Sequence, residues 1–194
     1  MRRCPGATLR PVPRFTLDDG HSLRPLDEAD AGELHALIER NRAELARWIQ
    51  WAQEQTPEQT LEFIRRARAK EAENRGLDRA LLDETLIIGV VGLPSIDVVH
   101  RTASIGYWLD RAHQGRGVAT AAVAAIVEHA FNGLHLNRLE IRADMENAAS
   151  RAVAERLGFR FEGTLREAYR VGDRYSNDAV YSLLAADRGH PRSS

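Results

Sequence analysis

The stretch from residue 105 to residue 120 constrains this chain most, because it joins three local patterns without a gap. Residues 102–109 alternate as a strand does, a glycine-containing loop follows, and residues 117–131 return to helical spacing. The first N–H groups of a helix lack internal partners and lie at the positive end of the helix dipole. A strand, a glycine loop and a helix in this order therefore predict an anion site suited to phosphate.

Several known phosphate patterns can be compared with this loop. A P-loop needs Gly-Lys-Ser/Thr, which does not occur here, and a dinucleotide fingerprint needs a third glycine where the chain has Thr120. The pattern Gln-x-x-Gly-x-Ala is met by Gln114, Gly117 and Ala119. Taken alone, the loop also fits an ordinary glycine turn.

The first half of the chain alternates between extended and helical patterns. Residues 14–26 alternate around a turn signal at Gly20 and predict a first strand or hairpin. Asp27 and Thr56 are placed to cap helices, and Pro57 suits a first helical turn. The expected helices are one after Asp27 with Leu34, Leu37 and Ile38, a short one carrying Leu45, Trp48 and Ile49, and one after Thr56 that stops near Gly76.

The second half is richer in strands. Strands are expected at 79–82, 86–93, 102–109, 138–144, 159–169 and 178–185, and helices at 117–131 and from Asn147 to Leu157. Antiparallel-looking strands followed by a β-α-β unit indicate an α/β fold with a mixed sheet. We expect one domain over residues 14–186, with flexible termini at 1–13 and 187–194.

Composition excludes several classes of protein. The net charge of -1 gives no overall basic field for nucleic acid or an anionic membrane. No stretch approaches the ~20 apolar residues of a membrane span, and Met1-Arg2-Arg3 is not followed by the apolar run of a signal peptide. The single cysteine, Cys4, cannot form an intrachain disulfide, which fits a reducing cytoplasm. His129 and His135 are an unconvincing metal pair, so we expect no metal.

Short motifs along the chain occur together in one order. They are Asn41 through Trp51 with two tryptophans, Ile88-Gly89-Val90-Val91-Gly92, Ile105-Gly106-Tyr107-Trp108-Leu109, the Gln114–Thr120 loop, Asn147-Ala148-Ala149-Ser150, Leu157-Gly158-Phe159, Glu162-Gly163 and Tyr181-Ser182-Leu183-Leu184. In this order the chain resembles the GNAT N-acetyltransferase superfamily, and more narrowly its ribosomal-protein alanine N-acetyltransferase (RimJ/RimL-type) branch. The resemblance covers about residues 14–186.

The resemblance implies a mostly antiparallel sheet with helices on both faces and acetyl-CoA as cosubstrate. Two parallel strands, 102–109 and 138–144, would splay apart around the thioester. Backbone groups of the first strand would bind the pantetheine arm, and those of 115–120 the pyrophosphate. The implied cofactor-binding residues are Tyr107, Trp108, Leu109, Gln114, Gly115, Arg116, Gly117, Val118, Ala119, Thr120, Asn147 and Ser150. Without the resemblance, the sequence favours a core position for Tyr107, a helix cap for Asn147 and a surface position for Ser150.

The implied chemistry is direct attack of an amine on the thioester, with no covalent enzyme intermediate. An N–H near Leu109 would polarise the carbonyl. Many superfamily members protonate the thiolate with a tyrosine whose place here is taken by Ala154. The resembling branch uses a serine three residues after an asparagine, which is Ser150. Asp78 is the first candidate for the base; the further candidates are Asp97 and Glu44, and each of the three also fits a solvated carboxylate.

The implied acceptor site lies on the opposite side of the splay. Its candidate residues are Asn41, Glu44, Trp48, Trp51, Tyr169 and Tyr175. The favoured acceptor is a protein N-terminal amine; the alternatives are a small-molecule amine, such as an amino acid, polyamine or antibiotic, and a non-catalytic acyl-CoA-binding module. Relatives are often dimers, so a homodimer is a further expectation.

Overall fold

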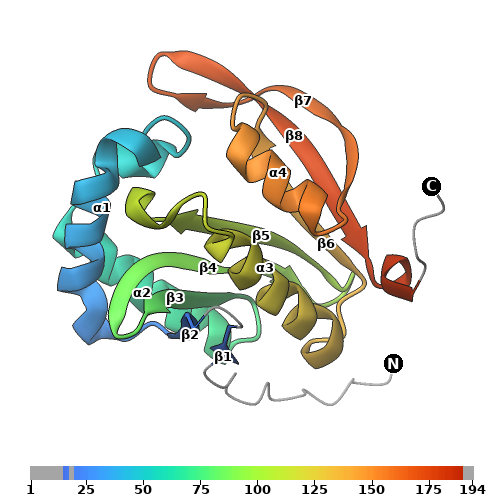
Figure 1. Cartoon of the computed structure of the whole chain (residues 1–194), viewed down its shortest axis with the longest axis horizontal. Coiled ribbons are helices and arrows are strands. Elements are labelled where there is room, and N and C mark those ends of the chain that lie inside the picture. Colours follow the sequence, from blue (N-terminus) through green and yellow to red (C-terminus); the bar gives the residue numbers. More distant parts are fainter. Residues whose placement is uncertain (1–14, 18–19, 190–194) are drawn as a thin grey trace.

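The fold is a single eight-stranded sheet with helices on both faces (Figure 1). The computed structural model describes residues 15–17 and 20–189, so Cys4, the predicted flexible segment 1–13 and residues 190–194 lie outside the described part. The strands are β1 (Phe15–Thr16), β2 (Ser22–Pro25), β3 (Leu77–Asp83), β4 (Leu86–Asp97), β5 (Thr102–Leu109), β6 (Arg138–Asp144), β7 (Arg160–Val171) and β8 (Arg174–Leu184). Their order is β1-β2-β3-β4-β5-β6-β8-β7, which confirms the predicted mixed sheet.

Two apolar clusters hold helices against opposite faces of this sheet. The helices are α1 (Ala31–Leu45), α2 (Pro57–Ala72), α3 (Val118–Glu128) and α4 (Ala148–Arg156). One cluster joins α1 and α2 to Ala80, Leu82 and Val90, and the other joins α3 and α4 to Leu81, Val91 and Ile105. Neighbouring strand residues therefore point into different clusters, as the two-residue period of a strand requires.

The predicted helix starts are confirmed, but two predicted helix details are wrong. Asp27 and Thr56 both form capping boxes. The short helix predicted over Leu45 to Ile49 is absent: α1 runs to Leu45, a turn follows, and a 3-10 helix covers Gln50–Gln53. Ile49 is extended, with φ -130° and ψ 110°, which breaks helical continuity. Likewise α2 ends before Gly76, because Asn74 takes a left-handed φ of 58° that asparagine tolerates.

The C-terminal strands form a longer hairpin than the sequence predicts. β8 begins at Arg174 instead of residue 178, and β7 runs to Val171. Gly172, with φ 59°, makes the tight turn between the two strands, and Arg170 pairs with Tyr175. Beyond residue 186, the predicted flexible tail is still helical as far as Gly189, in the 3-10 helix Ala185–Gly189.

The parallel pair β5 and β6 separates partway along its length. Thr102 to Ile105 pair with Arg138 to Ile141, and no pairing continues beyond Ile105 and Ile141. Both strands go on, β5 to Leu109 and β6 to Asp144. The predicted splay is therefore present, and it lies between the C-terminal ends of these strands.

Close backbone contact explains the glycine at position 89. A Cβ on Gly89 would lie 2.4 Å from the carbonyl oxygen of Trp108, nearer than atoms of that kind approach. Gly89 pairs with Leu109 at the last position of β5. The glycine therefore lets β4 support the free end of β5, which has no partner on its other side.

Candidate active site

A cavity of about 1050 Å³ passes through the splay between β5 and β6. Its lining joins the two faces of the sheet. On the α3 and α4 side it includes Thr120, Ala124, Ser150, Val153 and Arg156, and on the α1 side it includes Glu44, Trp48, Asp144 and Tyr169. A ligand lying in the splay therefore reaches both sides of the sheet at once.

The loop before α3 has the geometry of an anion site. Gly115 and Gly117 take left-handed φ values of 76° and 84°, which favour glycine. Gly117 is the residue before α3 and offers no side-chain cap, so N–H groups of the first helical turn are left for a ligand. The cavity is lined here by Gln114, Gly115, Gly117, Val118, Ala119 and Thr120. Six of the seven predicted loop residues thus lie together, while the exposed Arg116 is not among the lining residues.

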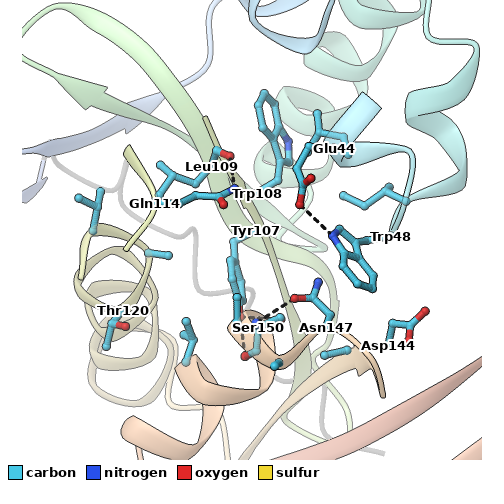
Figure 2. Close-up of a pocket in the computed structure, with 18 of the residues that line it drawn as sticks. Glu44, Trp48, Tyr107, Trp108, Leu109, Gln114, Thr120, Asp144, Asn147 and Ser150 are labelled. Atoms are coloured by element: carbon cyan, nitrogen blue, oxygen red, sulfur yellow. Dashed lines mark hydrogen bonds between the residues drawn. The ribbon is translucent and has the colours of Figure 1, made fainter. Parts of the chain in front are cut away.

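Side-chain hydrogen bonds fix both ends of this loop. The Gln114 amide donates to the carbonyl oxygen of Leu109 at 3.3 Å (Figure 2). At the far end Arg156 of α4 donates to the Thr120 hydroxyl at 2.6 Å. A cation therefore stands beside the first turn of α3, where a bound phosphate would lie.

The free edge of β5 carries the three residues predicted to bind pantetheine. Tyr107, Trp108 and Leu109 lie beyond the last paired position and line the cavity. Their side chains point to different faces: Tyr107 packs against the α3 cluster, and Trp108 against the α1 cluster, where its ring meets Trp51 edge-on at 6.4 Å. The backbone edge of β5, which lies between these two side chains, faces the splay.

Tyr107, Ser150 and Asn147 form a hydrogen-bonded group at the centre of the cavity. The Tyr107 hydroxyl lies 2.8 Å from the Ser150 hydroxyl, and the Ser150 backbone N–H donates to the Asn147 side chain at 3.1 Å (Figure 2). Burial raises the pKa of Tyr107 although the Ser150 hydrogen bond opposes it, so the phenol keeps its proton at neutral pH. Asn147 is therefore a helix cap and a cavity residue together.

The predicted acceptor residues divide into two groups. Glu44, Trp48 and Tyr169 line the cavity, and the Trp48 indole N–H donates to Glu44 at 3.4 Å. Asn41 does not line it: its buried amide donates to the carbonyl of Leu37 and accepts from the N–H of Arg111, which ties α1 to the loop after β5.

Two aromatic candidates and two carboxylates also lie outside the cavity lining. Trp51 is exposed beside Trp108, and Tyr175 is exposed on β8. Asp78, the predicted base, lies on β3 opposite Gly92 and is not among the residues that line the cavity. Asp97 is bound to His100 at 2.8 Å in the β4–β5 hairpin. Glu44 is the one candidate for the base that the structure brings to the cavity.

Sequence reasoning missed several charged residues of the cavity. They are Arg47, His113, Arg142, Asp144, Glu146 and Arg156. Asp144 carried a usable signal, since it ends a strand three residues before Asn147. Single arginines on helices and strands give no such signal, so Arg156 and Arg142 could not be recognised from the sequence.

Within residues 15–17 and 20–189, no group of three or more His, Cys, Asp or Glu side chains could hold a metal ion. No helix of this part of the chain is both long and apolar enough to cross a bilayer.

Comparisons with known proteins agree on one family. Residues 22–160 match the family model described as acetyltransferase (GNAT) domain. The putative ribosomal N-acetyltransferase YdaF of Bacillus subtilis (strain 168) is 35% identical over 165 residues, which cover 84% of this chain and 90% of that protein. The ribosomal-protein-serine acetyltransferase of Escherichia coli (strain K12) is 30% identical over 163 residues, 84% of this chain and 91% of that protein. The structure of RimL, a ribosomal L7/L12 alpha-N-protein acetyltransferase in complex with coenzyme A, matches with a TM-score of 0.83 at 26% identity, over 89% of this chain and 96% of that one.

Asp78 predicts a pH dependence of stability. Burial raises its pKa from 3.8 to about 6, although Lys70 and Arg79 oppose the shift. Because the pKa is raised in the folded state, the contribution of Asp78 to the free energy of unfolding is fully present below pH 3.8. That contribution falls as the pH rises from 3.8 through about 6, by about 3 kcal/mol at most. Asp78→Asn should therefore gain stability relative to the parent protein between pH 4 and 7.5, measured by urea unfolding at both ends. Equal pH profiles for Asp78→Asn and the parent protein would contradict the assignment.

Proposed function

Because this chain belongs to the GNAT acetyltransferase family and is an acetyl-CoA-dependent acetyltransferase, we propose that its acceptor is the α-amine at a protein N-terminus. Two relatives that cover 84% of the chain are named for ribosomal proteins, which supports this acceptor class. The observation that carries the proposal is the cavity that crosses the sheet. It allows acetyl-CoA to bind on one face of the sheet while the amine reaches the thioester from the other face.

The α3 and α4 side suits the cofactor. The N–H groups at the start of α3 would bind the pyrophosphate, with Arg156 adding positive charge nearby. The unpaired edge of β5 from Tyr107 to Leu109 would bind the amide groups of the pantetheine arm as a strand does. The thioester would then lie in the splay beside Tyr107 and Ser150.

The proposed reaction is a direct acyl transfer. The neutral amine attacks the thioester carbon, the C–S bond breaks, and the thiolate takes up a proton. The hydroxyl pair of Tyr107 and Ser150 is well placed to donate that proton, since the two oxygens lie 2.8 Å apart inside the cavity. Glu44 remains the candidate that takes up the proton of the amine, because its carboxylate lines the acceptor end.

The acceptor class is tested by following free thiol. With acetyl-CoA present, we expect thiol release with hexapeptides that begin with Ala or Ser, and little release when the same peptides carry a blocked N-terminus. Spermidine and free amino acids serve as the small-molecule arm. Thiol release with spermidine but with no peptide would indicate that the acceptor is a polyamine. Binding of coenzyme A without thiol release for any acceptor would favour a non-catalytic binding module.

Ser150→Ala and Tyr107→Phe should each lower kcat by about 100-fold, the scale of a lost general acid. The double variant should lose little more, because two groups that act as one unit are not additive. The affinity for acetyl-CoA, measured by calorimetry, should change less than about threefold, since most of the cofactor's binding energy comes from the phosphate loop.

The matched control is Tyr175→Phe, which removes an exposed hydroxyl on β8 and should leave kcat unchanged. Unchanged turnover in Ser150→Ala would remove that residue from the mechanism, and the same holds separately for Tyr107→Phe.

We also propose that the protein is a cytoplasmic homodimer. The cytoplasm is where ribosomal substrates are found, and the exposed Phe161 and Leu165 on the edge strand β7 offer apolar surface to a second copy. Sedimentation velocity should give a mass of two chains; a monomer at all concentrations would dismiss the dimer.

A further inference from the structure

A polar contact joins the two halves of the chain at the acceptor end of the cavity. Figure 1 shows the end of the β7–β8 hairpin reaching toward the segment that follows α1. Arg174 on this hairpin donates to the carbonyl oxygen of Arg47 at 3.1 Å. The Tyr169 hydroxyl lies 3.5 Å from the carbonyl oxygen of Trp48. The turn formed by residues 46–49 is therefore held by the hairpin through its backbone.

The same guanidinium is anchored on the rim of the splay. Arg174 donates to Asp144 at 2.8 Å, so it spans from the end of β6 to the 46–49 turn. Burial works to raise the pKa of Asp144, but hydrogen bonds from Ser176, the Glu146 backbone and Arg174 outweigh it and lower that pKa. The carboxylate thus stays charged at neutral pH and keeps Arg174 in place.

The 46–49 turn and the segment that follows it, residues 50–55, are both bonded to α1. Arg42 donates to the carbonyl oxygens of Ala52 and Gln55, and Trp48 donates to Glu44. Trp48, Tyr169 and Asp144 all line the cavity. The turn, the hairpin and the end of β6 therefore form a continuous rim around the acceptor opening.

We propose that the link from Asp144 through Arg174 to the carbonyl of Arg47, here called the clasp, limits which acceptors enter. The clasp fixes the position of the turn that carries Trp48, and the Tyr169 hydroxyl lies beside the carbonyl oxygen of that residue. Both rings line the cavity, so we expect the clasped arrangement to favour an unbranched chain end over a branched one. Arg174 is then a positioning residue: it acts through the backbone of the turn that carries Trp48. This inference rests on the acceptor entering by this opening, as proposed above.

Arg174→Ala should raise the KM for an Ala-initiated hexapeptide about tenfold, the scale of one lost charge-assisted hydrogen bond. The KM for acetyl-CoA should stay within about twofold, because the phosphate loop lies on the other face of the sheet. The ratio of kcat/KM between Ala-initiated and Ile-initiated hexapeptides should fall toward one, since the widened opening admits the branched side chain. If Arg174 served folding alone, Arg174→Ala would lower kcat/KM for both hexapeptides by the same factor and leave their ratio unchanged.

Both bonds of Arg174 come from one terminal nitrogen, Nη2. Arg174→Lys keeps a cation beside Asp144 on a shorter side chain, and it should give smaller changes in the same direction. This variant also serves if Arg174→Ala does not fold. Arg170→Ala is the matched control, because Arg170 lies on the same hairpin and bonds to Asp173 at its tip; all three readouts should be unchanged.

An unchanged acceptor KM and an unchanged peptide ratio in Arg174→Lys and Arg174→Ala would overturn the clasp. If the acceptor is not a protein N-terminus, the parent protein itself would release no thiol with either peptide, which distinguishes this outcome from failure of the clasp. The same comparison is then made with a linear and a branched amine of whichever class the parent protein accepts.

Discussion

The end of backbone pairing between β5 and β6 is the constraint on which the rest of this structure depends. Up to Ile105 and Ile141 the strands satisfy each other, and beyond them the facing N–H and C=O groups of β5 have no strand partner. Buried backbone N–H and C=O groups need hydrogen-bond partners, so this strand edge is stable only where water or a ligand can bond to it. A pantetheine arm carries amide groups of the required kind, and the cavity lies at this edge.

The splay also gives the two sides of the sheet different chemistry. On the α3 side the cavity meets glycines and helical N–H groups, which suit an anion. Elsewhere the lining includes the carboxylates Glu44 and Asp144, the rings of Trp48 and Tyr169, and the cations Arg47 and Arg142. The carboxylates and aromatic rings are groups that can receive an amine. Tyr107 and Ser150 lie between these regions, where bond making and breaking would take place. In the proposed arrangement the sheet would separate the cofactor from the acceptor, and the two would meet at the splay.

Prediction from sequence succeeded where the signal was local. The capping boxes at Asp27 and Thr56, the glycine loop before α3 and the Asn147 cap each depend on residues within a few positions of one another. The end of α2 was wrong because Asn74 took the left-handed conformation that glycine was expected to supply. The start of β8 was wrong because pairing with β7 extends a strand into residues with little strand pattern of their own.

By itself, the sequence determined the family, the order of the elements and the glycine loop before α3, since these follow from short-range periodicity and from short motifs that occur in one order along the chain. Only the tertiary structure decided which side chains share the cavity. It turned Asn41 toward the backbone of Arg111 and left Asp78 on β3, yet it brought Tyr107 to Ser150 across 43 positions and Arg174 to Arg47 across 127. Such contacts depend on how strands and helices pack, and no local pattern records which of many polar side chains will meet.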